Sequence, residues 1–255
     1  MTRRASPERE PMPALQVDFG SAEKLLREAE FLDCRSVWYS SNYVYLAQMS
    51  AGDERFAGIY KPHKGENPLW DFPDGHLYKH EAAAYEFARL LGWDFIPPTV
   101  VRDGPEGIGS VQLFVPHDPE EHFFVQRERP ALLPQLMRMC AFDAVVNNAD
   151  RKGGHCLLDE RGHIWGIDHG LCFHPSPKLR SVIWEWAGDD VPAEYLADLE
   201  EAGLAIAAED HSAAALLELL HEHESVAMLH RIERMLKEKR YPVPGEARHY
   251  PWPMV

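Results

Sequence analysis

The chain has 255 residues, of which 45% are hydrophobic, and is therefore long and apolar enough for one large domain or one two-lobed unit. Its 26 Lys and Arg side chains against 41 Asp and Glu side chains give a net charge of −15, which disfavours binding to nucleic acid and to anionic membrane surfaces. No apolar run reaches the roughly 18 residues of a transmembrane helix, so we expect no stable membrane association.

The N-terminal segment and the cysteines favour a cytoplasmic protein. Residues 1–12 are charged and have no apolar stretch behind them, which predicts a disordered tail and not a secretory signal. The four cysteines lie far apart along the chain and form no CxxC pair. This spacing favours reduced thiols in the core over a zinc site or disulfides.

The first half of the chain is expected to be rich in strands. A helix is predicted over residues 21–32, where Leu and Ala recur at helical spacing. The apolar and aromatic runs at 35–39 and 43–49 predict a hairpin, with the polar turn Ser40-Ser41-Asn42 between them. A third strand is expected over 55–62, where Pro62 ends it.

A connection rich in Pro, Gly and Asn, residues 63–75, leads from this strand to a predicted helix over 78–92. Gly92 is the expected C-terminal stop of that helix. Two further strands are predicted over 96–103 and 109–117, on either side of a turn.

The pattern becomes helical from about residue 117 onward. An apolar helix is predicted over 132–148, and two more helices are predicted over 193–206 and 212–240. Between them, residues 155–158 and 163–167 predict two short strands joined by a tight turn.

This predicted hairpin has an aspartate at each of its outer ends. Asp150 comes just before the first strand and Asp168 just after the second, so the turn brings the two carboxylates together. Two close carboxylates repel each other unless a cation or a shared proton joins them. The pattern is compatible with an acid/base pair, a divalent metal site, or phosphoryl transfer with one base and one Mg²⁺ ligand. A polar turn with two solvated aspartates is the simplest alternative.

Two residues of the first half favour the phosphate chemistry. Lys61 ends an apolar strand, and Glu81 lies near the start of the next helix, on the face of Ala84 and Ala88 that should pack inward. A buried carboxylate requires a cation, and Lys61 is the natural candidate. The alternative is a Lys whose stem alone is buried and an exposed first-turn Glu.

The ordered set "YKP", "HEAAAYEFARLLG", "IPPTVV", "GSVQLFV", "NNADR" and "IDHGLCF" resembles the phosphatidylinositol 3-/4-kinase group, and most closely the type II phosphatidylinositol 4-kinases. It also resembles an actinobacterial branch of this family, while bacterial serine kinases of the toxin class are more distant. The resemblance extends from about residue 36 to about residue 185.

The resemblance implies a nucleotide site in the first half of the chain. Ser40, Ser41 and Asn42 would form a turn that covers the phosphates of ATP, in place of a glycine-rich loop. Lys61 would hold the α- and β-phosphates and would be positioned by Glu81.

The resemblance also implies the adenine contacts and the reactive groups. The adenine would meet backbone groups of the linker at Gln112, Leu113, Phe114 and Val115. Asp150 would accept or orient the substrate hydroxyl, and Asp168, in a DHG triplet where protein kinases have DFG, would bind Mg²⁺.

Two departures from the family pattern bear on activity and substrate. His155 stands where the family usually has an Asn that binds a second metal, and imidazole is a poorer ligand for Mg²⁺ than oxygen. One metal, or Mn²⁺, or a weakened site would each accommodate it. The connection 62–80 lacks the cysteine-rich, palmitoylated insertion of the type II lipid kinases, which disfavours a membrane lipid as substrate.

Other polar and aromatic residues of the second half are expected to be structural. Asp143, Asn147 and Asn148 are interpreted as hydrogen-bonding groups at the helix end. Trp184 and Trp186 are expected to pack the second lobe. Lys178 and Arg180 are interpreted as surface charges, with contact to an anionic substrate as the alternative.

We therefore predict a two-lobed, protein-kinase-like α+β fold, with a nucleotide-binding lobe over 13–116, a helical lobe over 117–255 and ATP between them. The predicted activity is ATP-dependent phosphoryl transfer to a hydroxyl with Mg²⁺ or Mn²⁺. The alternatives are a nucleotide-binding pseudokinase and an AMP transferase with ATP in a flipped pose. The sequence leaves the substrate open between protein, small molecule and lipid.

Overall fold

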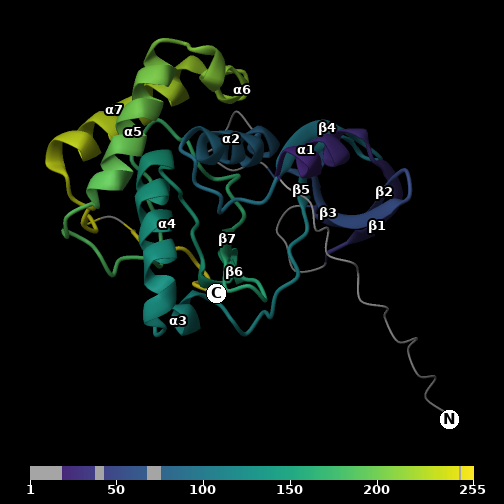
Figure 1. The fold of residues 1–255 in the computed structure, drawn as a ribbon, viewed down its shortest axis with the longest axis horizontal. Helices are drawn as coiled ribbons and strands as arrows, with labels where there is room; N and C mark the ends of the chain where they lie inside the picture. The colour runs from purple at the N-terminus through teal and green to yellow at the C-terminus, as the bar shows by residue number, and fades with distance from the viewer. Residues whose placement is uncertain (1–18, 38–42, 68–75, 247) are drawn as a thin grey trace.

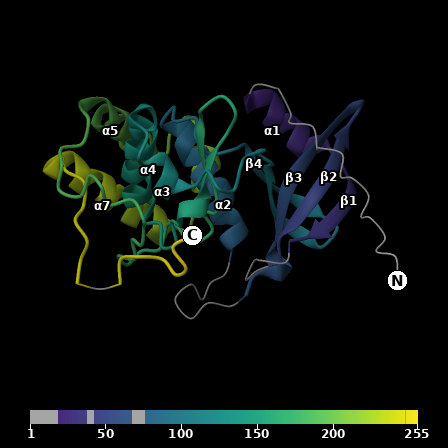
Figure 2. The same cartoon turned by 90° about the horizontal axis from the view of Figure 1, so that it is seen from below.

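The computed structural model describes residues 19–37, 43–67, 76–246 and 248–255. A five-stranded sheet and helix α1 (Phe19–Glu28) lie at one end of the molecule. Helices α4 (Leu133–Val146), α5 (Ala193–Ala207) and α7 (Glu222–Glu238) lie at the other end (Figures 1 and 2). This is the two-lobed α+β architecture predicted from the sequence.

The sheet is antiparallel throughout and has the strand order β1–β2–β3–β5–β4. Its strands are β1 (Glu30–Ser36), β2 (Tyr45–Ala51), β3 (Glu54–Pro62), β4 (Thr99–Gly104) and β5 (Gly107–Leu113). Because β3 lies at the centre of the sheet, its C-terminal end is held between β2 and β5.

The first strand differs from its prediction. The helix expected over 21–32 ends at Glu28, and the residues from Glu30 onward pair with β2 instead. In the extended conformation Phe31 packs against Tyr60, with ring centroids 5.3 Å apart, and Leu32 points away and is 49% exposed. Contact between strands that are distant in sequence outweighs the local helical spacing.

Helix α2 (Leu77–Leu90) lies between the sheet and the helical lobe (Figure 1). Gly92 ends it as predicted: its φ is 66°, and its N–H donates to the carbonyl of Arg89 over 3.0 Å. The helix is buried along most of its length, and Ala84 and Ala88 face inward as expected.

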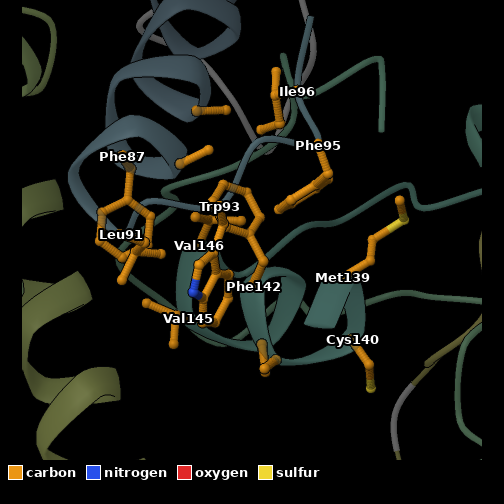
Figure 3. Close-up of a cluster of buried hydrophobic side chains, with 14 of the residues drawn as sticks. Phe87, Leu91, Trp93, Phe95, Ile96, Met139, Cys140, Phe142, Val145 and Val146 are labelled. Carbon is orange, nitrogen blue, oxygen red and sulfur yellow. The ribbon is translucent and has the colours of Figure 1, made fainter. Parts of the chain in front are cut away.

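Helix α2 belongs to the part of the chain predicted as the nucleotide-binding lobe, which was expected to end at residue 116, but it packs against the helical lobe. Phe142 of α4 lies between Phe87 of α2 and Phe95, with ring centroids 5.5 Å and 5.0 Å away, respectively (Figure 3). Trp93, just after α2, belongs to the same buried cluster. The sheet has a separate core that includes Met49, Tyr60 and Val111. The helix that supplies Glu81 is therefore anchored in the core of the helical lobe.

The remaining elements are short, and all except η1, which follows β3 beside the sheet, lie in or next to the helical lobe. They are η1 (His63–Gly65), α3 (Phe123–Gln126), η2 (Pro130–Leu132), η3 (Gly153–His155), β6 (Cys156–Leu158), β7 (Ile164–Gly166), η4 (His211–Ala213) and α6 (Ala214–Leu217). None of the helices in the described ranges is long and apolar enough to span a lipid bilayer. The four cysteines are free thiols, and three of them are buried, as expected for reduced core residues.

The single helix predicted over 212–240 is divided into η4, α6 and α7. A new helix begins after His221, whose backbone N–H donates to the Glu224 carboxylate over 2.9 Å. The same carboxylate lies 3.0 Å from His80 of α2. This contact with a distant part of the chain fixes the break, because the local sequence has neither Gly nor Pro to end a helix.

Candidate active site

Lys61, at the end of β3, is bonded to two carboxylates from different parts of the chain. Its ammonium donates to Glu81 Oε1 of α2 and to Asp168 Oδ1, the latter over 2.9 Å. The strand end is fixed by β5, because Pro62 pairs with Gly109 and a Cβ at Gly109 would overlap the Lys61 carbonyl. Lys61, Glu81 and Asp168, which the sequence predicted to belong to one site, lie together.

The charged groups in this cluster shift one another's pKa values. Burial alone would lower the pKa of Lys61, but Asp168 and Glu81 raise it well above its usual value. Burial raises the pKa of Glu81, whose side chain is only 4% exposed, while Lys61 opposes that rise. The pKa of Asp168 is held well below its usual range, because Lys61 and His155 outweigh the effect of burial.

The backbone around Asp168 is shaped to point its carboxylate toward Lys61. Asp168 has a φ of 61°, in the left-handed region, just after β7. The N–H of the next residue, His169, donates to Glu81 Oε2 over 3.0 Å, so each oxygen of the Glu81 carboxylate has its own donor. The carbonyl of Gly170 lies 3.0 Å from His80 Nδ1, a second link to α2.

His155 lies on the other side of Asp168. Its Nε2 is 3.2 Å from Asp168 Oδ2, and its Nδ1 accepts from the Lys152 N–H over 3.4 Å. Burial lowers the pKa of His155 to about 4, although Asp168 opposes the shift. At neutral pH the ring is therefore uncharged and donates to Asp168 through Nε2.

Asp150 lies in the loop after α4, and its side chain is 23% exposed. It forms an ion pair with Lys152 Nζ at 3.0 Å. Burial raises the pKa of Asp150, Lys152 opposes this, and the nearby charge of Asp168 raises it further. The hairpin brings its ends together as predicted: Cys156 pairs with Gly166, and the Ile167 N–H donates to the His155 carbonyl over 3.1 Å.

A buried cluster around Arg151 supports the loop that carries Asp150. Arg151 is fully buried and donates to both carboxylate oxygens of Asp143, over 2.8 and 2.9 Å. It also donates to the carbonyl of Ile167 over 3.0 Å and to Nε2 of His169 over 2.6 Å. The guanidinium of Arg151 therefore joins the loop after Asp150 to the end of α4 and to the residues on both sides of Asp168.

Asn147 and Asn148 hold the same loop through the backbone, as the sequence predicted for helix-end groups. Asn147 ends α4 with a φ of 57°, and its side chain donates to the carbonyls of His174 and Ser176 over 2.7 and 2.8 Å. The side chain of Asn148 accepts from the Asp150 N–H over 3.0 Å.

The C-terminal segment also contacts this region. The Gly153 N–H donates to the carbonyl of Met254 over 2.7 Å, and the Ser181 N–H donates to the carbonyl of His249 over 3.0 Å. Trp184, expected to pack the second lobe, is half-buried and donates to the same His249 carbonyl over 3.2 Å. Trp186 packs against the core of the helical lobe.

The sequence missed Arg151, Lys152 and His169 as members of this site. The available signal was an arginine directly after Asp150, between an apolar helix and an apolar strand, where a solvated side chain is less expected. Lys178 and Arg180, interpreted as surface charges, are half-buried.

The structure describes some of the residues predicted to contact ATP and leaves others outside its described ranges. Ser40, Ser41 and Asn42 lie outside the described residues. Gln112 is buried, and its side chain donates to Thr99 Oγ1 over 2.8 Å. The Phe114 N–H donates to the carbonyl of Ala57 over 3.0 Å, so this amide holds the linker to the sheet. Val115 is buried next to it. The adenine contacts of this linker stay a prediction.

Asp168 and His155 are the residues that could hold a metal ion here. In the described parts of the chain no three His, Cys, Asp or Glu side chains are grouped to bind one. This fits Mg²⁺ bound through one carboxylate together with substrate phosphates better than a closed zinc site. Both oxygens of Asp168 already have donors, Lys61 and His155, so a metal must displace at least one of them.

Comparisons with known proteins agree with this geometry. The family model described as phosphatidylinositol 3- and 4-kinase matches residues 100–202, a range that includes Asp150, His155 and Asp168. Protein Rv2133c of Mycobacterium tuberculosis (strain ATCC 25618 / H37Rv) is 36% identical over 262 residues, which cover 90% of this chain and 94% of that protein.

A solved structure shares the fold. The proinflammatory kinase CtkA of Helicobacter pylori superposes with a TM-score of 0.50 over 85% of this chain and 94% of its own. The two sequences are 12% identical, so this likeness concerns the fold alone.

The buried Arg151–Asp143 pair generates a stability prediction. Arg151→Met leaves the Asp143 carboxylate buried without its cation and should lower the free energy of unfolding by about 3–5 kcal/mol, measured by urea denaturation. Adding Asp143→Asn to this variant should recover part of the loss, because the uncompensated charge is gone. The control is Arg240→Met, which removes an exposed ion pair and should cost at most about 1 kcal/mol. Equal losses for the two single variants would contradict the supporting role of Arg151.

Proposed function

Because the chain belongs to a phosphatidylinositol 3-/4-kinase-related family, we propose that it is an ATP-dependent kinase that transfers the γ-phosphoryl group to a hydroxyl of its substrate. The main support is the convergence of one lysine and two aspartates. Lys61 is held between Glu81 and Asp168, and Asp150 is close enough for the charge of Asp168 to raise its pKa.

In this proposal Lys61 binds the α- and β-phosphates of ATP. Phosphoryl transfer depends mainly on positioning and on charge neutralisation, and a lysine whose pKa is raised stays charged throughout. Glu81 is the positioning residue, because it is buried in a helix anchored to the helical lobe. The turn at 40–42 and the linker at 112–115 would complete the nucleotide site.

Asp150 is the proposed base. As the substrate oxygen bonds to the γ-phosphorus, the bond from phosphorus to the β,γ-bridging oxygen breaks, the hydroxyl proton passes to Asp150, and ADP leaves. A carboxyl whose pKa is raised by burial is better matched to proton transfer near neutral pH. Lys152, paired with Asp150, keeps the carboxylate in place and limits that rise.

Asp168 would hold Mg²⁺ or Mn²⁺, with His155 beside it. When bound, such an ion neutralises charge on the β- and γ-phosphate oxygens. To offer Nε2 to the metal, the uncharged ring of His155 would have to carry its proton on Nδ1 and give up its bonds to Asp168 and to the Lys152 N–H. A nitrogen ligand suits Mn²⁺ better than Mg²⁺.

A nucleotide-binding pseudokinase is the second candidate. Lys61 and His155 occupy both oxygens of Asp168, an arrangement in which the protein itself satisfies the carboxylate that should bind metal. Transfer of label from γ-labelled ATP into the protein, lipid or small-molecule fraction of a cell extract separates the two functions. The gain of AMP instead of phosphate, seen by mass spectrometry, would indicate nucleotidyl transfer.

Lys61 gives the first test of this proposal. Lys61→Ala should weaken the binding of ATP with Mg²⁺ at least tenfold in calorimetry, because it removes a charged donor to the phosphates. The control is Lys64→Ala, three residues along the chain, whose side chain is 79% exposed and should not affect binding. The absence of ATP binding by the unaltered protein would refute the proposed nucleotide site.

Asp150 gives the second test. Asp150→Asn should slow the transfer of label by roughly 10²–10⁴-fold if Asp150 acts as the base. ATP affinity should stay close to that of the unaltered protein, since Asp150 is assigned to the hydroxyl and not to the nucleotide. Asp190→Asn, at an exposed aspartate, is the matched control. Equal transfer rates for Asp150→Asn and the unaltered protein would rule out the base.

His155 gives a test of the metal. His155→Asn replaces a ring nitrogen by an amide oxygen, which Mg²⁺ prefers. The ratio of the transfer rate with Mn²⁺ to that with Mg²⁺ should fall by roughly tenfold, the scale on which changes around a metal alter affinity. An unchanged ratio would show that His155 does not meet the metal.

A further inference from the structure

A cavity lies in the helical lobe, separate from the cluster around Lys61. Its volume is about 550 Å³, within the range of small-molecule sites. Its walls come from α4, α7, the segment 175–179 and the C-terminal residues 242–245 and 248–249. None of Lys61, Glu81, His155 and Asp168 contributes to its lining.

The charge of this cavity is opposite to that of the whole protein. Its described lining includes four cationic side chains, those of Lys178, Arg231, Arg234 and Arg248, and one carboxylate, that of Glu238. The complete chain has a net charge of −15. A concentration of positive charge on an acidic protein creates a local potential that attracts anions.

Arg231 indicates where an anion would bind. Its Nε donates to the carbonyl of Val145 over 2.6 Å, and its Nη1 donates to the carbonyl of His174 over 3.3 Å. Its Nη2 is buried and has no hydrogen-bond partner among the residues that the structure describes. A buried donor without a partner is costly, and a small shift of the guanidinium toward the cavity would let an anion there satisfy it.

Arg234 lies three residues along α7, on the same side of the helix. Burial, followed by the charge of Arg234, lowers the pKa of Arg231 to about 10. The two like charges repel each other, and an anion between them would remove that repulsion.

The rest of the lining is largely apolar. Leu179, Trp184 and Val243 contribute side chains, together with several prolines. Trp184 is held in place by its bond to the His249 carbonyl. A ring or other apolar body could pack on this surface while its charged group meets the arginines.

We propose that this cavity binds an organic phosphate, with the phosphate on Arg231 and Arg234 and an apolar or aromatic body against Trp184 and Leu179. This binding is additional to the proposed kinase reaction and does not depend on it. The occupant would also contact Asn147, the residue whose side chain ties the loop before Asp150 to the segment 174–178.

The test uses 1-naphthyl phosphate as the probe and calorimetry of the full chain without ATP. Arg234→Gln should weaken binding by roughly tenfold or more, and added salt should weaken binding to the unaltered protein. Lys237→Gln is the matched control, because it removes a positive charge from α7 outside the lining of the cavity and should leave the affinity unchanged.

Two further measurements locate the probe. Uncharged 1-naphthol should bind much more weakly than its phosphate, and Lys61→Ala should bind the phosphate like the unaltered protein. The proposal is overturned if 1-naphthyl phosphate does not bind, if Arg234→Gln binds it equally well, or if Lys61→Ala abolishes binding in a preparation that thermal unfolding shows to be folded. The last result would place the probe at the nucleotide site. Thermal unfolding of both variants checks the fold, and Arg234→Gln should unfold at the same temperature as the unaltered protein because Arg234 is exposed.

Discussion

The bonds of Lys61 to Glu81 and Asp168 join the sheet to the helical lobe at the proposed active site. Lys61 belongs to the sheet, Asp168 follows the hairpin of the helical lobe, and Glu81 belongs to a helix that packs in the helical core. The Glu81 side chain is almost completely buried, so its charge depends on Lys61 and on the His169 amide. A buried carboxylate of this kind is strongly destabilising without its partners. The charged state of Glu81 therefore depends on the sheet, which carries Lys61, staying in place against the helices.

The helical side of the site is rigid for a different reason. Arg151 makes its bonds below the surface, to Asp143, to His169 and to backbone carbonyls, and none of these groups is available to a substrate. Asp150, directly before it in the chain, keeps a partly exposed side chain. The same short loop therefore has a buried, hydrogen-bonded residue, Arg151, next to a partly exposed carboxylate, Asp150. Catalysis by positioning requires a reactive group that is held in place in this way.

Much of this organisation could be predicted from the sequence, since it depends on local patterns. Helical spacing placed Glu81 on the inward face of its helix, and a tight turn between two short apolar strands brought Asp150 and Asp168 together. The features that were not predicted depend on contacts between distant residues. Residues 30–34 became part of a strand because β2 pairs with them, and α7 begins after His221 partly because Glu224 meets His80. Likewise, Lys178 precedes Arg231 and Arg234 by more than fifty positions along the chain, and no spacing rule places it in the same cavity.

The contacts of the loop around Asp150 also affect the order of folding. Its backbone is tied to Arg180, and Gly153 is bonded to Met254, about one hundred residues further along the chain. Contacts between residues so distant in sequence require the closure of long loops, which slows their formation compared with helices and hairpins. The helices and the sheet should therefore form first, and the loop that holds the proposed base should acquire its final geometry among the last steps of folding.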